Sequence, residues 1–518
     1  MRTQRGHWLA IAAAAALVLS AGCATLPSQE GRTDSRALPG TDATRLGRAT
    51  GAAAAAHPGK SGIYAMPMPP DAFAARVLLA AAAERSLDLQ YYIWNADETG
   101  VLLYEAVWRA AGRGVRVRIL LDDANTEGLD ATLATLDAHP NIEVRLYNPL
   151  PMRTARIVNF ATDFARLNRR MHNKSFTADS HASIVGGRNV GNAYFAAGEG
   201  IAFADLDVLA IGPVVREVSA EFDLYWNSAS AYPVASIVPP APADATRALL
   251  ERFAEVRANP VSSRYLEALR RTDLVQRLLD KQLEFEWAHA NVVSDDPAKT
   301  LDTRGRTDLL LISELLPAIG LPAASFDLVS PYFVPGDGGT AMLTELAARG
   351  VAVRVLTNAL ATNDVWPVHA GYAKRRCTLL RSGVRLYELK PSASVEGVRP
   401  KAHFGSSSGV ELHAKTFAMD RTRIFVGSFN FDQRSAHLNT EMGLVIDSPA
   451  LAQRLAGALD AESARTTYEA RVASDGRCPV WIDHAPSGDV VHDVEPGTTF
   501  GQRLLIDILE ALPIEWLL

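Results

Sequence analysis

Apolar and polar positions in the first half of the chain follow two alternating patterns. The pattern predicts helices over residues 74–85, 100–111 and 129–138. It predicts strands between and after them, over residues 87–94, 115–121 and 142–147. Arg113-Gly114 is a helix stop signal, and Val or Ile alternates with Arg in the strand that follows. Strands that alternate with helices indicate a largely parallel α/β sheet.

The second half of the chain repeats this pattern. Residues 325–329 (SFDLV) match 86–90 (SLDLQ), and 348–354 (ARGVAVR) match 112–118 (GRGVRVR). The repeat predicts two similar domains. The predicted divisions are a domain at 61–231, a Pro-rich then helical connector at 232–304, a second domain at 305–470 and a C-terminal extension with an apolar helix at 471–518.

The first 23 residues have the pattern of a targeting segment. Arg2 and Arg5 precede an apolar run over 8–19, which is too short for a comfortable membrane span. The tetrapeptide Ser20–Cys23 resembles a bacterial lipobox and predicts a lipid-modified Cys23; plain secretion or an uncleaved anchor is the alternative. We expect a membrane-attached lipoprotein facing the periplasm, and Ala24 favours the outer membrane over the inner. Residues 24–60 are rich in small residues and predict a flexible tether.

Composition narrows the functional class. The chain has 518 residues, 48% of them hydrophobic, so it can bury a large core. Its net charge of −6 shows no global basic footprint, so we expect no nucleic-acid partner, although a local patch is left open. The three cysteines, at positions 23, 377 and 478, predict neither a disulfide framework nor a metal cluster, and the histidines lack zinc-site spacing. We therefore expect no metal and no cofactor.

One motif occurs twice with identical spacing. The first copy consists of His172, Lys174, Asp179, Gly186-Gly187 and Asn189. The second consists of His413, Lys415, Asp420, Gly427-Ser428 and Asn430. In both copies Lys follows His by two residues, Asp follows Lys by five, Gly follows Asp by seven and Asn follows Gly by three. A coincidence of this length is improbable by chance, on the order of 10⁻⁴ or less for one copy.

The residue types in this motif suit phosphodiester chemistry. In a strand, His-x-Lys places both side chains on one face, where imidazole can attack phosphorus or move a proton and ammonium can hold a phosphate oxygen. Gly187 and Ser428 are small enough to let the backbone approach a ligand, and Asn189 and Asn430 can donate to the same oxyanion. Short strands are predicted around the motif, over 175–177, 184–185, 416–419 and 424–426. The motif aspartates, Asp179 and Asp420, suit a hairpin turn or a supporting position better than direct action.

With these motifs the sequence resembles the phospholipase D superfamily. Over roughly residues 60–518 it is similar to bacterial cardiolipin synthases of the C type, notably at 168–174 (NRRMHNK), 364–372 (DVWPVHAGY) and 512–518 (LPIEWLL). The resemblance implies two phospholipase D-like domains, each a mixed, mostly parallel sheet flanked by helices. It also implies one active site at their interface.

The resemblance also implies roles for the site residues. His172 attacks phosphorus and forms a phosphohistidine, while His413 protonates the leaving group; the reverse assignment is left open. Lys174 and Lys415 supply charge, and the motif aspartates, Asp179 and Asp420, belong to the catalytic set. A carboxylate after each motif, Asp205 and Glu441, holds the second nitrogen of each histidine; a solvated strand-end carboxylate is the alternative.

Several further residues have two interpretations each. Arg169 and Arg170 meet lipid phosphates or are solvated charges, and His369 and Tyr372 line the headgroup pocket or are structural. A cluster after the second motif braces the site; it consists of Asp432, Arg434 and Ser435. The apolar tail at 504–518 docks on the body or lies at a bilayer surface.

The function expected from the resemblance is a phosphatidyltransferase that makes cardiolipin from phosphatidylglycerol and a second phospholipid, phosphatidylethanolamine or phosphatidylglycerol. Its expected partners are these phospholipids and the membrane surface, and the need for an accessory protein is left open. A hydrolytic phospholipase D, a nuclease on the same scaffold and a noncatalytic phosphate-binding scaffold are the alternatives. Two intact His/Lys/Asn sets argue against the last one.

Overall fold

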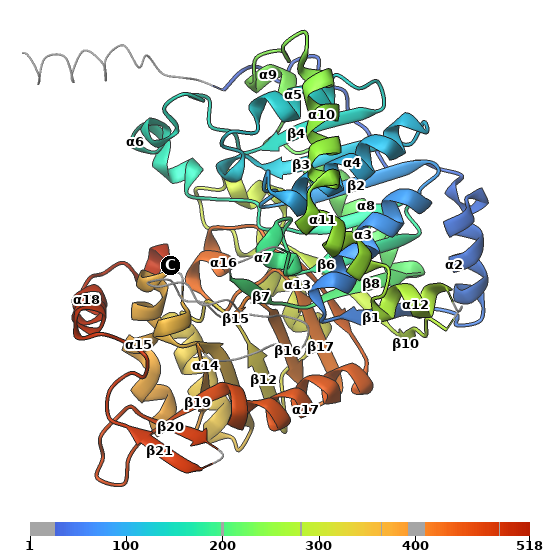
Figure 1. Ribbon diagram of the computed structural model, residues 1–518. Coiled ribbons are helices and arrows are strands. Elements are labelled where there is room, and N and C mark those ends of the chain that lie inside the picture. The colour runs from blue at the N-terminus through green and yellow to red at the C-terminus, as the bar shows by residue number, and fades with distance from the viewer. Residues whose placement is uncertain (1–25, 198–200, 280–281, 364, 392–409, 486) are drawn as a thin grey trace, which may run out of the picture.

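The computed structural model describes residues 26–518 except 198–200, 280–281, 364, 392–409 and 486. Two lobes are visible in Figure 1, one built from the blue and green first half and the other from the yellow and red second half. The predicted targeting segment, including Cys23, lies outside the described residues.

The first lobe is a nine-stranded sheet with the order β10-β1-β8-β6-β5-β2-β3-β4-β9. Its strands are β1 (Ser61–Met66), β2 (Ser86–Tyr91), β3 (Arg116–Asp122), β4 (Ile142–Tyr147), β5 (Ser175–Ala178), β6 (Ala182–Gly186), β8 (Asp207–Ile211), β9 (Ala231–Pro233) and β10 (Glu286–Ala288). The helices before the connector are α3 (Pro69–Ala82), α4 (Glu98–Gly112), α5 (Asp130–Asp137), α6 (Arg156–Leu167), α7 (Asn192–Phe195) and α8 (Pro213–Trp226).

The second lobe repeats this order within a ten-stranded sheet, β11-β18-β17-β16-β12-β13-β14-β19-β20-β21. Its strands are β11 (Ala290–Ser294), β12 (Ser325–Val329), β13 (Ala352–Asn358), β14 (Arg385–Leu389), β16 (Lys415–Met419), β17 (Arg423–Gly427), β18 (Met442–Ile446), β19 (Thr467–Arg471), β20 (Val480–Ala485) and β21 (Gly488–His492). Its helices are α13 (Leu311–Ile319), α14 (Gly336–Ala348), α15 (Trp366–Arg381), α16 (Gln433–His437) and α17 (Pro449–Thr466). The series β8-β6-β5-β2-β3-β4-β9 thus corresponds strand by strand to β18-β17-β16-β12-β13-β14-β19.

The predicted helices and strands are present, but the expectation of a mostly parallel sheet is wrong. Only β2, β3 and β4 in the first lobe and β12, β13 and β14 in the second are mutually parallel. The other neighbours pair antiparallel, because each motif folds as a hairpin, β5–β6 or β16–β17, on the edge of its parallel core. Helix–strand alternation identifies the parallel core but does not show on which side a hairpin joins it.

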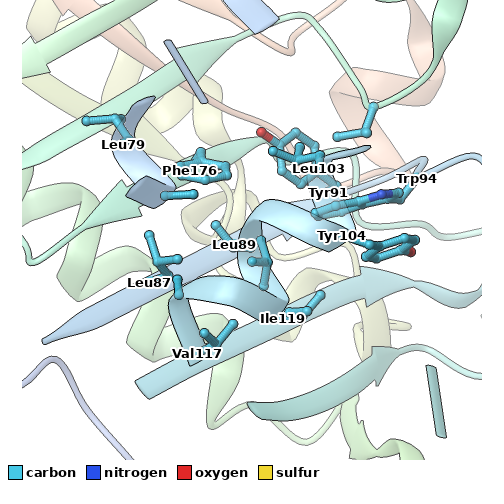
Figure 2. Packing of buried hydrophobic residues seen from close by; sticks show 14 of the residues in the cluster. Leu79, Leu87, Leu89, Tyr91, Trp94, Leu103, Tyr104, Val117, Ile119 and Phe176 are labelled. Atoms are coloured by element: carbon cyan, nitrogen blue, oxygen red, sulfur yellow. The ribbon is translucent and has the colours of Figure 1, made fainter. Parts of the chain in front are cut away.

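Alternation along β2 separates an apolar face from a polar one. Leu87, Leu89 and Tyr91 are fully buried and pack with Val117 and Ile119 of β3, as Figure 2 shows. Each such aliphatic side chain contributes roughly 1.5–3 kcal/mol of hydrophobic stabilisation on burial. On the other face a buried salt bridge joins Asp88 to Arg118 at 2.7 Å, and the second lobe has its counterpart in Asp327 and Arg354 at 2.6 Å.

The segment predicted as a flexible tether is folded where the structure describes it. It contains α2 (Arg45–Ala55), whose N-cap Thr44 accepts a hydrogen bond from the Gly47 amide. Upstream, the Arg32 guanidinium donates to the carbonyls of Asn227 and Ser228. A run of small residues predicts flexibility, but small residues also allow close packing against the body.

The connector contributes to both lobes. Its helices are α9 (Val234–Ile237), α10 (Ala245–Ala258), α11 (Pro260–Leu269) and α12 (Asp273–Leu279), followed by β10 in the first sheet and β11 in the second. Residues 286–294 therefore tie the two sheets together. The predicted connector, 232–304, thus contains a strand of each sheet.

The C-terminal extension divides into two parts. Strands β20 and β21 extend the second sheet, so that lobe reaches beyond the predicted limit of residue 470. Helix α18 (Phe500–Glu510) packs on α15 through Ile506, which is buried against Leu360 and Ala370. The three cysteines predict no disulfide framework, but Cys377 of α15 is bonded to Cys478, with the Cα atoms 5.8 Å apart. Within the described residues, no helix has both the length and the apolar character to cross a membrane.

Candidate active site

The two lobes form backbone hydrogen bonds with each other next to the motif histidines. The His172 amide donates to the Thr440 carbonyl at 2.8 Å, and the His413 amide donates to the Ala204 carbonyl at 2.7 Å. Beside the second contact, β7 (Ala202–Ala204) pairs in parallel with β15 (Val410–Leu412). Both histidines precede their hairpin strands rather than lying within them, which differs from the strand position expected for His-x-Lys.

These interlobe contacts place each histidine beside a carboxylate of the other lobe. His172 Nδ1 lies 2.8 Å from Glu441 Oε2, and His413 Nδ1 lies 2.5 Å from Asp205 Oδ2. The expected carboxylate contact at the second ring nitrogen is confirmed. That each histidine contacts the carboxylate of the other lobe is a new finding. The sequence aligns Asp205 with Glu441 but does not show which histidine each one meets. A hydrogen bond at Nδ1 fixes the tautomer and leaves Nε2 for chemistry.

The lysines lie beside their own histidines. The Lys174 ammonium donates to the His172 carbonyl, and the Lys415 ammonium donates to the His413 carbonyl. Both side chains are only 1% exposed, so water screens their charges poorly. Burial lowers the pKa of Lys174 to about 7, with Lys415 adding repulsion and Glu441 opposing the shift. The ammonium also lies 5.6 Å from the centre of the Tyr92 ring.

Both imidazoles favour the neutral form in the empty site. Burial lowers the pKa of His172 to about 4, and the Glu441 carboxylate opposes this shift. Burial, together with Lys415 and Lys174, also places the pKa of His413 well below its usual value. Tyr92 packs edge-on against His172, and Tyr194 packs edge-on against His413. A bound phosphodiester anion would offset the cationic repulsion and favour protonation of one imidazole.

The two carboxylates have different surroundings. Glu441 accepts hydrogen bonds from the hydroxyls of Ser428 at 2.5 Å and Ser435 at 2.7 Å. Although burial opposes it, His172, Lys174 and Ser428 hold the pKa of Glu441 below its usual value. Asp205 accepts from the Leu206 amide, and burial raises its pKa. Glu441, the partner of His172, is therefore firmly ionised. Asp205, the partner of His413, holds a proton more readily.

Two residues predicted to bind substrate instead support these carboxylates. The Ser428 hydroxyl is engaged with Glu441 and also accepts from the Met442 amide. A Cβ atom at Gly187 would lie 2.2 Å from Asp205 Oδ1, so this glycine makes room for the carboxylate. Small residues at the end of the hairpin permit the close approach of a protein carboxylate, and the predicted approach of a ligand stays a prediction.

Residues of the connector hold Glu441 from behind. Asp295 Oδ2 accepts from the Glu441 amide at 2.8 Å, and Asp295 Oδ1 accepts from the Lys299 ammonium at 2.8 Å. Lys299 also donates to the Ser435 carbonyl. Burial raises the pKa of Asp295 to about 7, although Lys299 opposes the shift. Sequence analysis missed both residues, because they lie outside the repeated motif and have no repeated counterpart.

The motif asparagines differ from one another. Asn189 accepts from the Ile93 amide and donates to the Tyr194 hydroxyl, so its side chain organises the protein. Asn430 Oδ1 is buried and has no hydrogen-bond partner among the residues that the structure describes. Donation from the Asn430 amide nitrogen to a phosphate oxygen stays a prediction, while the contacts of Asn189 point to support of Tyr194.

The motif aspartates brace turns. Asp179 has φ 50°, and its carboxylate accepts from the amides of Arg85 and Ser86 at 2.8 and 2.9 Å. Asp420 has φ 52° and accepts from Ala324 and Ser325 at 2.7 and 2.9 Å. Each carboxylate therefore ties its hairpin to the start of the adjacent strand. These contacts favour the turn interpretation over a catalytic role.

The structure resolves most of the other uncertain residues. Arg170 is buried and donates to Asp122, which also accepts from the Met171 amide, so this arginine positions the motif and does not meet lipid. Arg169 donates to the Lys299 carbonyl. In the second lobe His369 contacts Glu495 at 2.6 Å, and Tyr372 donates to Glu388 at 2.9 Å. Both are buried, as the structural interpretation requires.

The cluster expected to brace the site does so. Asp432 accepts from the Ser435 amide at 2.6 Å, and the Ser435 hydroxyl continues to Glu441. Arg434 donates to Asn168 of the first lobe and to Leu517 near the C-terminus. Among the described residues, no group of three or more His, Cys, Asp or Glu side chains is arranged to hold a metal ion.

Comparison with known proteins agrees with this geometry. The family model described as "Cardiolipin synthase, PLD-like domain" matches residues 78–226 and 315–462, one match in each lobe. The chain belongs to this family. It is 45% identical to cardiolipin synthase C of Escherichia coli K12 over 462 residues, which cover 89% of this chain and 97% of the relative.

Two further similarities bear on the fold and the spread of the family. An uncharacterized protein of Helicobacter pylori 26695 is 30% identical over 86% of this chain and 87% of its own length. The crystal structure of phosphatidylserine synthase from Haemophilus influenzae has a TM-score of 0.50, with 16% identity, over 79% of this chain and 87% of that structure. The latter similarity supports the fold alone. Both motifs fall within the matched ranges, so the phospholipase D-like nature of the site is established.

Proposed function

We propose that the protein is a phosphatidyltransferase that forms cardiolipin from phosphatidylglycerol and a second phospholipid. The observation that carries the proposal is the crossed pair of His–carboxylate contacts with a buried lysine beside each histidine. The identity to cardiolipin synthase C over nearly its whole length supports the substrate class. Phosphatidylethanolamine is the preferred donor, and a second phosphatidylglycerol is the alternative.

His172 Nε2 attacks the phosphorus of the donor, and the bond to the headgroup oxygen breaks. His413 gives its proton to that oxygen, so the headgroup leaves as an alcohol rather than an alkoxide. Neutral His413 then takes the proton from a glycerol hydroxyl of phosphatidylglycerol, which attacks phosphorus and releases His172. Lys174 and Lys415 offset the charge on the non-bridging oxygens. The ionised Glu441 suits His172 as nucleophile, because it stabilises the cationic phosphohistidine.

Transfer rather than hydrolysis requires that an alcohol, not water, reaches the phosphohistidine. His172 is 7% and His413 is 8% exposed, so little of either ring meets bulk solvent. A positioned hydroxyl can reach effective molarities of about 10⁵ M or more, enough to compete with water. This burial supports the transferase over a hydrolytic phospholipase D.

Mass spectrometry of mixed vesicles tests the proposal. Purified protein with phosphatidylglycerol and headgroup-labelled phosphatidylethanolamine should yield cardiolipin and labelled ethanolamine. Cardiolipin without labelled ethanolamine would assign the donor to a second phosphatidylglycerol. His172→Ala and His413→Ala serve as matched inactive controls. Phosphatidic acid as the only product, or cleavage of DNA with neither lipid consumed, would overturn the transferase assignment.

We also propose that the protein is a lipoprotein attached to the outer membrane and facing the periplasm. The segment before Cys23 and its lipobox-like sequence are the basis. The Cys377–Cys478 disulfide supports an oxidising compartment. An exposed apolar stripe at the C-terminus supports contact with a bilayer; it consists of Phe500, Leu504, Ile508, Leu512 and Trp516. Cys23→Ser should abolish lipid labelling, and recovery of wild-type protein from the soluble cytoplasmic fraction would contradict this location.

A further inference from the structure

A cavity of about 720 Å³ lies between the two lobes, away from the ring nitrogens that carry the chemistry. The first lobe contributes β1, the start of β8 and the segment before β10. The second lobe contributes β16, β17 and α17. In Figure 1 these elements face each other where the lower edge of the first lobe meets α17. Its volume is in the range of roughly 300–1,000 Å³ that small-molecule sites occupy.

Most of the buried side chains on the inner wall of this cavity are aliphatic; the polar exceptions are Asp71, Asp205 and Thr416. The aliphatic residues include Ile63, Val208, Leu412, Ile424 and Val426. These side chains offer a ligand no hydrogen-bond partner, so a sugar, nucleotide or peptide backbone would lose its hydration without replacement. A hydrocarbon chain loses nothing in this way and gains from burial.

The outer margin of the cavity is charged. Two acidic and two basic side chains on this margin are exposed: Asp273, Arg277, Glu284 and Arg454. An apolar interior below a margin of both charge signs suits an amphiphile that inserts its tail and leaves a polar head outside. At ~30 Å³ for a group the size of a water molecule, the cavity has room for on the order of twenty methylene-sized groups.

The cavity touches the segment that holds His413. Ala204, Asp205 and Leu206 contribute to its wall from the first lobe, and Leu412 and Ala414 flank His413 from the second. Thr416 also lines it, with a buried hydroxyl that has no hydrogen-bond partner among the described residues. An occupant would therefore lie beside the segments that carry the His413–Asp205 contact, and it would meet one hydroxyl able to bond a ligand oxygen.

We propose that this cavity binds one acyl chain of a phospholipid and thereby stabilises the contact that Asp205 already makes with His413. The inference rests on the proposed function for the presence of such lipids, but the binding itself does not require turnover. The chain belongs either to a reacting lipid or to a second lipid that stays bound, and the experiment below separates these two sources.

Calorimetric titration with dodecanoyl lysophosphatidylethanolamine, below the concentration at which it forms micelles, tests binding to the purified full-length protein. Ala458→Trp on α17 and Ala65→Phe on β1 place bulk in the cavity, and both should raise the dissociation constant at least ten-fold. Gln453→Trp, on the same helix but outside the cavity lining, is the matched control and should bind as the wild type does. Equal binding by the wild type and both filled variants, or no binding by the folded wild type, would overturn the proposal.

Turnover of lipids with different chain lengths identifies the source of the chain. If the chain belongs to a reacting lipid, the filled variants lose kcat/KM for long-chain lipids and retain it for dihexanoyl lipids. If it belongs to a second lipid, added lysolipid activates the wild type on dihexanoyl substrates and fails to activate the filled variants. Both outcomes support the cavity, whereas filled variants with wild-type rates on every lipid and unchanged response to lysolipid contradict it. A protein that binds lysolipid but makes no cardiolipin would refute the proposed function and leave the cavity assignment standing.

Discussion

The two motif histidines are equivalent in sequence but not in their surroundings. Glu441 has two hydroxyl donors and an amide held by Asp295, whereas Asp205 has one backbone donor. The better stabilised anion is the better partner for an imidazole that becomes cationic on phosphorylation. Burial raises the pKa of Asp205. A carboxylate of that kind is the better partner for an imidazole that must hold and release a proton. The asymmetry therefore favours His172 as nucleophile and His413 as acid.

Removing the charge of Glu441 tests this assignment. Glu441→Gln should lower kcat by about 10²–10⁴-fold, the scale seen when the carboxylate partner of a catalytic histidine is neutralised. The covalent phosphoenzyme, trapped by acid-free rapid quench and mass spectrometry, should fail to accumulate. Asp205→Asn is the matched control: it should slow the reaction while leaving modification on His172. Modification on His413 in either variant would reverse the assignment.

Lys174 predicts a pH dependence. With its pKa lowered to about 7, its ammonium is present in the free enzyme below that pH and is lost above it. In the proposed mechanism this ammonium holds the substrate phosphate, so kcat/KM should show a decline as the pH rises through about 7, in addition to the loss of protonated His413 at lower pH. His172 keeps its neutral form down to a pH near its pKa of about 4, so it does not limit activity on the acid side until then.

Lys174→Arg is the control for that pH profile, because a guanidinium stays charged over the whole range. The variant should have a lower maximum but lose the decline near pH 7. Steady-state rates at fixed ionic strength measure both profiles. A decline that persists unchanged in the variant would assign it to another group.

At residue level, the sequence identified the histidines and lysines that meet at the candidate site but not all of the groups that support them. Repeated spacing identified both histidines and both lysines, because chemistry requires those residue types. Substrate contact by Gly187 and Ser428 stays a prediction, whereas their contacts with Asp205 and Glu441 depend on packing that the sequence does not show. Asp295 and Lys299 act through a backbone amide and a carbonyl, contacts that leave no pattern in a sequence.

Among the structural elements, the hairpin turn after each motif lysine has the same conformation in both lobes. Asp179-Ser180 and Asp420-Arg421 all have positive φ values between 50° and 54°. An aspartate tolerates this conformation better than most residues. Its carboxylate then caps the amides that begin β2 or β12, which fixes the hairpin against the parallel core.

Asp179→Ala should therefore affect stability more than chemistry. It leaves the amides of Arg85 and Ser86 without an acceptor, a loss of about 1–3 kcal/mol in the free energy of unfolding. Urea unfolding measures this, and turnover per folded molecule should stay within a few-fold of wild type. Asp179→Asn, which keeps one acceptor oxygen, should lose less. A variant with unchanged stability and a hundred-fold lower turnover would restore the catalytic interpretation of the motif aspartate.

The predicted bounds of helices and strands were accurate where one pattern of apolar and polar positions continued through the whole segment. β4 occupies the predicted residues 142–147, and α4 extends the predicted 100–111 by only a few residues. Prediction failed for sheet direction and for the predicted tether. Both depend on contacts between distant segments, such as Arg32 with the carbonyls after α8.

On the scale of the whole molecule, neither lobe has a complete site. His172 needs Glu441, His413 needs Asp205, and backbone bonds at Thr440 and Ala204 hold both crossings. The repeat correctly indicated a shared site at the interface. It could not indicate the crossing, because two aligned carboxylates fit either histidine equally well in sequence.

The disulfide was missed for a related reason. Three cysteines give an odd count and no framework spacing, and Cys377 and Cys478 are 101 residues apart. Only the packing of α15 beside the second sheet brings them together. Because disulfides persist in oxidising compartments, this bond makes the proposed location testable on the folded protein.

Protein exported with its targeting segment should contain the Cys377–Cys478 bond, whereas protein made without residues 1–23 should hold both thiols reduced. Alkylation followed by peptide mass spectrometry distinguishes the two forms. Closing a loop of this length restricts the unfolded chain, so Cys377→Ser with Cys478→Ser should lower the free energy of unfolding of the exported protein by about 2–4 kcal/mol. In protein made without residues 1–23, whose thiols are already reduced, the same double substitution should change the free energy of unfolding little. Free thiols at both positions in exported, active enzyme would contradict the oxidised form and remove its support for a periplasmic location.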